Sequence, residues 1–210
     1  AQDSPIFGIL KKCELSQDQQ RKIKNYADEI GLVFFSTPFD LDSVDFLNDL
    51  NVSLFKIASF DIVNEKLLDA VAKVGVPVIM SRGMANSQEI DQALKIFNAY
   101  NCEYALLHCI SAYPTPKEAV NLNVIATLKK KYNCIIGYSD HTLDIDASIY
   151  AVAAGARIIE KHFTLDRNME GPDQKMSVDP IALAELCKKI REVEVMLGSG
   201  EIQPVPAEEG

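Results

Sequence analysis

The chain has 210 residues, of which 48% are apolar, and a formal net charge of −9. This length allows one sizeable domain with its own core, and the acidic balance argues against nucleic acid or an anionic membrane as a partner. No apolar run approaches the roughly 18–20 residues that a membrane-spanning helix needs. The five cysteines are an odd number and form no CxxC pair, so we expect reduced thiols and a cytoplasmic protein.

Six short apolar runs alternate with segments of helical periodicity along the chain. Each run is nearly continuous in apolar residues, which is typical of strands buried on both faces of a parallel sheet. The predicted strands are Leu32–Phe35, Leu54–Ala58, Pro77–Met80, Tyr104–Ile110 and the runs that open at Cys134 and at Ala156. The first 15 residues do not have the pattern of a strand.

Helices with recognisable ends are predicted between these runs. A capping-box pattern at Ser16 and Gln19 begins a helix that runs to residue 31. Asp179 followed by Pro180 is a typical helix start, and that last helix runs to residue 198. The other predicted helices span 67–74, 86–100, 122–132 and 145–155.

This alternation predicts an α/β fold, either an open doubly wound sheet or a closed (β/α)8 TIM barrel. A barrel needs eight strands and typically about 250 residues, so six units leave two strands missing. The chain begins in the middle of a unit, which favours a barrel whose first two strands are absent from the sequence. We therefore predict a barrel domain over 1–198, incomplete at its N-terminus, and a linker over 199–210.

Two of the three histidines follow buried strands in matching positions. His141 closes the segment that opens at Cys134, and His162 closes the one that opens at Ala156. Neighbouring parallel strands would bring both imidazoles to the same end of the sheet, where they could hold a metal together with carboxylate, water or substrate oxygens. Alternatively, each histidine is a helix cap or a hydrogen-bonded structural residue. Asp140 could orient His141 or form a turn.

The other predicted strand ends carry small hydroxyl side chains and one lysine. In parallel α/β folds, ligands bind beyond the carboxyl ends of the strands. Hydroxyls beside a lysine suit an anionic ligand such as a phosphate or a carboxylate, although each serine alone could be an ordinary turn residue. Glu160 lies two residues before His162 and shares its face of the strand, so it could act as an acid–base group or as a carboxylate that orients a metal ligand. The strand-end residues are Thr37, Lys56, Ser59, Ser81, Ser111, Ser139 and Glu160.

Six motifs occur in order over nearly the whole sequence, as residues 35–40, 56–59, 113–116, 137–142, 160–165 and 171–173. Taken together, these motifs resemble the sialic acid synthase family. The resemblance implies a TIM barrel followed by a small antifreeze-like domain, in a homodimer of the full-length protein. It implies an enzyme that condenses phosphoenolpyruvate with N-acetylmannosamine or a related bacterial amino sugar, forming a C–C bond and releasing phosphate and a nine-carbon keto acid.

The resemblance also implies roles for particular residues. His141 and His162 would hold a divalent metal, most often Mn²⁺, with Mg²⁺ or Co²⁺ as alternatives. Phosphoenolpyruvate would contact the lysine and hydroxyls at 37, 56, 59, 81 and 139, and Tyr113 and Asp173 would meet the amino sugar. Ser111 stands where the family often has asparagine. The family's opening strands and C-terminal domain are not in the sequence. We therefore expect the full-length protein to catalyse the condensation, and this 210-residue chain alone to be inactive.

Two other functions stay open at this point. A metal-dependent TIM-barrel hydrolase would use a metal-bound water as its nucleophile, although such a site usually has more histidines. A non-catalytic binding or assembly fragment would account for missing strands. Among the synthases, Gly171-Pro172-Asp173 favours the sialic and legionaminic branches over the pseudaminic one, by resemblance.

Overall fold

The computed structural model describes residues 5–204 and 206–208. Its single sheet has five strands in chain order, and all neighbouring strands are parallel. The strands are β1 (Phe55–Ile57), β2 (Val78–Ser81), β3 (Tyr104–Cys109), β4 (Ile135–Asp140) and β5 (Ile159–Lys161). The predicted α/β class with a parallel sheet is confirmed.

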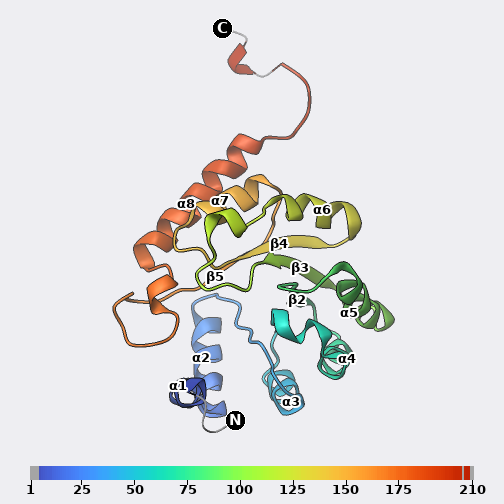
Figure 1. Ribbon diagram of the computed structural model, residues 1–210, viewed down its shortest axis with the longest axis vertical. Helices are drawn as coiled ribbons and strands as arrows, with labels where there is room; N and C mark the ends of the chain where they lie inside the picture. The colour runs from blue at the N-terminus through green and yellow to red at the C-terminus, as the bar shows by residue number, and fades with distance from the viewer. Residues whose placement is uncertain (1–4, 205, 209–210) are drawn as a thin grey trace.

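Helices cover the outer side of this sheet. In Figure 1, α3 to α8 follow one another in an arc around the strands, while α1 and α2 lie near the N-terminus. The helices are α1 (Pro5–Cys13), α2 (Gln17–Glu29), α3 (Leu41–Asp49), α4 (Glu65–Val74), α5 (Ser87–Ala99), α6 (Asn123–Lys131), α7 (Asp146–Ala153) and α8 (Pro180–Leu197). The sequence analysis did not predict α1 and α3, which are short helices of nine residues each.

Local sequence signals account for the helix ends. Ser16 accepts a hydrogen bond from the backbone N–H of Gln19, whose side chain accepts one from the backbone of Ser16, so the capping box is complete. Gly75 ends α4 with a φ of 81°, a conformation that glycine adopts without strain. Asp179 caps α8, and Pro180 is its first residue.

The main core lies between the sheet and the outer helices. Alternate strand residues such as Ile57, Met80 and Leu106 are fully buried and belong to one cluster with helix residues such as Val71 and Phe97. The residues between them on the strands face the opposite side of the sheet. On that inner side Gly137 is required by packing, because a Cβ there would lie 2.4 Å from the side chain of Leu107.

The prediction of a strand at Leu32–Phe35 is wrong, so the sheet has five strands instead of six. The backbone bond between this part of the chain and β1 runs from the Lys56 N–H to the carbonyl of Ser36, the residue that follows the segment. Leu32 and Val33 are mostly exposed, and a strand needs a continuous ladder of backbone bonds with a neighbour. The apolar run alone could not show whether that neighbour is present.

The part of the chain that the structure describes forms an open sheet with β1 and β5 at its edges. The arc of helices is that of a partial barrel, and closure into eight strands is not observed here. Beyond α8, residues 199–204 extend away from the sheet (Figure 1). Among the described residues, no helix combines the length and the apolar character that crossing a membrane requires.

Candidate active site

A cavity of about 260 Å³ opens at the carboxyl ends of the strands, and nine of the eleven predicted site residues line it. These nine are Thr37, Lys56, Ser59, Ser81, Tyr113, Ser139, His141, Glu160 and His162. They come from β1, β2, β4 and β5, from segments that follow strands, and, for Thr37, from the segment between α2 and α3. The parallel sheet therefore brings together residues that are up to 125 positions apart in the sequence, from 37 to 162.

Lys56 provides the positive charge of this cavity. It lies on the inner face of β1, is 7% exposed, and its Nζ donates hydrogen bonds to Ser81 Oγ at 2.8 Å and to the Ile57 carbonyl at 2.9 Å. The nearest carboxylate oxygen, on Glu160, is 3.5 Å from Nζ. A buried ammonium held beside a hydroxyl suits an anionic group of a ligand.

Glu160 connects the lysine to the histidine side of the cavity. Ser139 and Glu160 are register partners on β4 and β5, and Ser139 Oγ donates to Glu160 Oε1 at 2.6 Å. The other carboxylate oxygen faces Lys56. The carboxylate is thus held between a donor and a cation, which is a suitable position for a group that exchanges a proton with a ligand.

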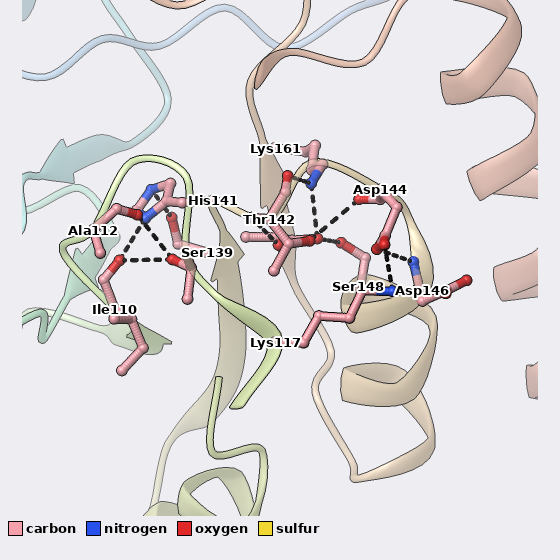
Figure 2. Close-up of polar contacts among 12 residues, drawn as sticks. Ile110, Ala112, Lys117, Ser139, His141, Thr142, Asp144, Asp146, Ser148 and Lys161 are labelled. Atoms are coloured by element: carbon pink, nitrogen blue, oxygen red, sulfur yellow. Dashed lines mark hydrogen bonds and ion pairs between the residues drawn. The ribbon is translucent and has the colours of Figure 1, made fainter. Parts of the chain in front are cut away.

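His141 is held in one orientation. Its Nδ1 lies 2.8 Å from the Ile110 carbonyl, so Nδ1–H donates there and Nε2 keeps its lone pair, 3.4 Å from Ser139 Oγ (Figure 2). Burial lowers the pKa of this imidazole below its ordinary value. A neutral ring with a free Nε2 is the form that binds a metal ion.

The two imidazoles lie side by side at the cavity mouth, next to an aromatic side chain. The ring centroids of His141 and His162 are 5.6 Å apart. The Tyr113 ring lies 4.2 Å from the first and 5.9 Å from the second, and burial raises the pKa of its phenol. Asp173 Oδ2 is 3.7 Å from Nδ1 of His162, so this residue lies at the rim.

The donor set fits part of the coordination sphere of a divalent metal. His141 and His162 are adjacent and could supply two nitrogen ligands. Within residues 5–204 and 206–208, no group of three or more His, Cys, Asp and Glu side chains is arranged to hold a metal. Water or substrate oxygens would have to complete the sphere, which leaves positions open for a ligand.

Comparison with protein-family models matches residues 1–202 to the NeuB family. The chain belongs to the NeuB family. It is 43% identical over 203 residues to the N,N'-diacetyllegionaminic acid synthase of Campylobacter jejuni, covering 95% of the chain and 61% of that protein. It is 41% identical over 196 residues to the human N-acetylneuraminate-9-phosphate synthase, covering 93% of the chain and 55% of the relative.

A solved structure agrees with this membership. The sialic acid synthetase of Leptospira borgpetersenii, determined in complex with citrate, superposes with a TM-score of 0.96 at 39% identity over 100% of the chain and 73% of that protein. The chain spans about three fifths of the length of the curated NeuB-family relatives that it matches. The predicted family is confirmed, and the curated relatives named here are synthases.

Ser111, one of the two predicted residues outside the cavity lining, is set behind the cavity wall. Its Oγ is 3.4 Å from that of Ser59. Gly83 packs against both serines with a φ of 46°, and a Cβ at this position would lie 2.3 Å from Ser59 Cβ. The loop after β2 can approach Ser59 this closely only because it carries a glycine there.

Four residues that were not predicted as site residues also line the cavity, namely Phe39, Ala58, Phe60 and Cys109. Phe39 and Phe60 stack with ring centroids 5.7 Å apart and an interplanar angle of 12°, and Cys109 lies at the end of β3. Each is next to a predicted site residue or two positions from one, so a search around the strand-end hydroxyls could have found them. Burial raises the pKa of the Cys109 thiol, which keeps it protonated at neutral pH.

The third histidine, His108, lies away from the cavity and is held by structural hydrogen bonds. His108 is fully buried on the outer face of β3, with Nε2 2.8 Å from the Val120 carbonyl. Arg82 donates to its Nδ1 and therefore does not line the cavity. Desolvation by burial is the main reason that the pKa of His108 is lowered.

Proposed function

We propose that this chain carries the catalytic site of a metal-dependent synthase that condenses phosphoenolpyruvate with an N-acyl amino sugar. The products are phosphate and a nine-carbon sialic-type keto acid. The observation that carries the proposal is one cavity that holds both the Lys56–Ser81 pair and two adjacent imidazoles. The named activities of NeuB-family relatives support it.

Lys56 and the hydroxyls around it would bind the phosphate and carboxylate of phosphoenolpyruvate. The lysine donates a hydrogen bond to Ser81 and lies close to the Glu160 carboxylate, which in turn accepts a hydrogen bond from Ser139. Ser59 and Thr37 line the same wall and add donors that can rotate toward an oxygen. These groups act mainly by positioning the substrate and compensating its charge.

His141 and His162 would hold a divalent metal, Mn²⁺ in the first place and Mg²⁺ or Co²⁺ as alternatives. When bound, such an ion supplies Lewis-acid polarisation of a carbonyl oxygen. Tyr113 packs on both imidazoles, and Asp173 lies beside His162. In this proposal, both would orient the amino sugar so that its aldehyde faces the bound phosphoenolpyruvate.

The condensation forms a C–C bond and a bond from carbon 2 to a water oxygen, and it breaks the bond from carbon 2 to the phosphate oxygen. Carbon 3 of phosphoenolpyruvate attacks the aldehyde carbon of the open-chain sugar, whose oxygen takes up a proton and becomes a hydroxyl. Water adds to carbon 2, where positive charge develops, and loses one proton to Glu160, which balances the proton taken up by the sugar oxygen. The bond from carbon 2 to the phosphate oxygen then breaks, the second water proton leaves with the phosphate, and the ketone and inorganic phosphate remain. Ser139 and Lys56 hold Glu160 for this transfer.

The wider organisation of the protein belongs to the same proposal. We infer a complete (β/α)8 barrel in which segments outside this chain supply the missing strands, followed by an antifreeze-like domain after the 199–210 linker. We also infer that the full-length protein is a homodimer and is located in the cytoplasm. The longer relatives of the family support the additional segments, and the five unpaired cysteines, all within the described part of the chain, support a reducing compartment.

A phosphate-release assay on the full-length protein tests the proposal. Phosphoenolpyruvate is supplied alone and with a panel of N-acyl hexosamines that includes N-acetylmannosamine and a diacetylated sugar, each with Mn²⁺ and with a chelator. We expect release only when sugar and metal are both present, with a keto acid formed in equal amount. Equal release without sugar would identify a hydrolase, and no release under any condition would identify a binding module.

A further inference from the structure

At the carboxyl ends of β4 and β5, successive side chains point to opposite faces of the sheet. The residues that face the cavity are Ser139, His141, Glu160 and His162. Between them in the sequence lie Asp140 and Lys161, which are direct register partners and point to the opposite, helix-covered face. Asp140 is therefore flanked in the sequence by two cavity residues, Ser139 and His141, and Lys161 is flanked by Glu160 and His162.

Asp140 and Lys161 form a buried ion pair. Lys161 Nζ lies 3.0 Å from Asp140 Oδ2, and the two side chains are 4% and 0% exposed. Lys161 Nζ also donates to the Thr142 carbonyl at 2.7 Å. Figure 2 shows Lys161, Thr142 and Ser148 gathered together, in a group separate from His141 and Ser139.

The remaining hydrogen bonds of the carboxylate join it to the segment after β4 and to α7. The Thr142 N–H donates to Asp140 Oδ1 at 2.8 Å, and Ser148 Oγ, in α7, donates to Oδ2 at 2.6 Å. Thr142 and Ser148 are both buried. The residues directly before and after His141 are therefore both bonded to Lys161, which directly precedes His162.

We propose that the Asp140–Lys161 pair is a positioning device that sets the separation of the two imidazoles. The pair crosses from β4 to β5 at one register position, and the residue that directly follows each strand is a histidine. A shift of either strand by one residue would turn the histidine of that strand away from the cavity, since side chains alternate with a period of two. What the imidazoles hold rests on the proposed function, whereas their separation does not.

The test uses the double variant Asp140→Asn/Lys161→Met in the full-length protein. Removing both charges avoids the uncompensated buried charge that either single change would leave, so the double variant is expected to fold. It also removes the donor that holds the Thr142 carbonyl. The matched control, Asp91→Asn/Lys131→Met, makes the same changes in a half-exposed pair between α5 and α6, where the two groups are 3.0 Å apart.

Two measurements decide the outcome. The dissociation constant for Mn²⁺, measured by calorimetry, is expected to rise about 10–100-fold in the double variant and to stay unchanged in the control. A crystal structure of the metal-free double variant is expected to show a ring-centroid separation different from 5.6 Å. An unchanged affinity, or an unchanged separation, overturns the positioning role.

The design separates this inference from the proposed function. If the wild-type protein binds no Mn²⁺, or if His141→Ala binds Mn²⁺ as tightly as the wild type, the metal part of the proposed function fails. The ring separation in the metal-free double variant then decides the positioning role by itself. If the double variant binds Mn²⁺ and keeps the geometry of the wild type, the ion pair serves stability alone.

Discussion

The carboxyl ends of β4 and β5 and the N-terminal segment 17–39 are built in opposite ways. At the strand ends, Asp140, Thr142 and Ser148 are buried and bonded to one another or to Lys161. In the N-terminal segment, α2 has no buried residue, although its cap is complete. The first region depends on contacts between distant residues, and the second depends on local sequence.

This difference shows that a helix can be specified by neighbouring residues in the sequence, whereas the geometry of the site depends on contacts between distant residues. α2 forms because Ser16 caps it and because Lys24 pairs with Asp28 one turn later at 2.6 Å, both within a few residues. The imidazoles of His141 and His162 meet only because two strands pair in one register. Four predictions test this contrast, and those with the strongest effects come first.

Asp140→Ala should destabilise the protein most. It leaves the Lys161 ammonium buried without its partner, which typically costs about 3–5 kcal/mol in the free energy of unfolding. Urea denaturation measures the loss. The N-terminal counterpart, Lys24→Ala, breaks an ion pair on a helix whose residues are not buried and should change stability by less than about 0.5 kcal/mol. Equal losses in the two variants would remove the contrast between the regions.

His141→Ala should abolish most of the metal-dependent condensation while leaving the fold intact. The loss of one group that stabilises developing charge typically lowers kcat by about 10²–10³-fold. Steady-state kinetics with phosphoenolpyruvate and the amino sugar measures it in the full-length protein. His108 lies outside the cavity, so His108→Gln should leave kcat within a few-fold of the wild type. Full activity of the His141 variant would refute its proposed role as a ligand.

Stability should fall as the pH drops through the ordinary histidine pKa of about 6.5. Burial lowers the folded-state pKa of both His108 and His141, so below that pH the unfolded chain binds protons that the folded protein does not. Each histidine contributes up to about 1.4 kcal/mol per pH unit until the pH reaches its folded-state pKa. Urea melts between pH 8 and 5 measure the slope, and His108→Gln should reduce it. A pH-independent stability over this range would show that neither burial effect operates.

Ser16→Ala should have the smallest effect. It removes the cap of α2, which costs about 0.5–1 kcal/mol in helix stability, but few tertiary contacts depend on this helix. We expect a small decrease in helical circular dichroism and little change in the midpoint of global unfolding. A large shift of the midpoint would mean that α2 is as tightly coupled to the core as β4 and β5 are.

Sequence patterns were sufficient for much of the fold and for most of the site. Apolar runs located all five strands, because burial on both faces requires a continuous apolar sequence, and helix ends followed from caps such as Asn86 and Gly75. The strand at 32–35 was wrong because strand formation needs a pairing partner, which an apolar run does not reveal. Phe39 and Phe60 were missed because stacking joins two different loops.

The chemical groups of the site, and the strands that carry them, can be read from the amino-acid sequence alone. The sequence placed Lys56 on one strand, and His141 and His162 after two others, with Glu160 on the face that His162 shares. Only the tertiary structure decided that Ser139 bonds Glu160, that Ile110 orients His141, and that Asp140 pairs with Lys161. Side-chain period follows from the chain alone, whereas register between strands depends on packing and on buried polar contacts across the sheet.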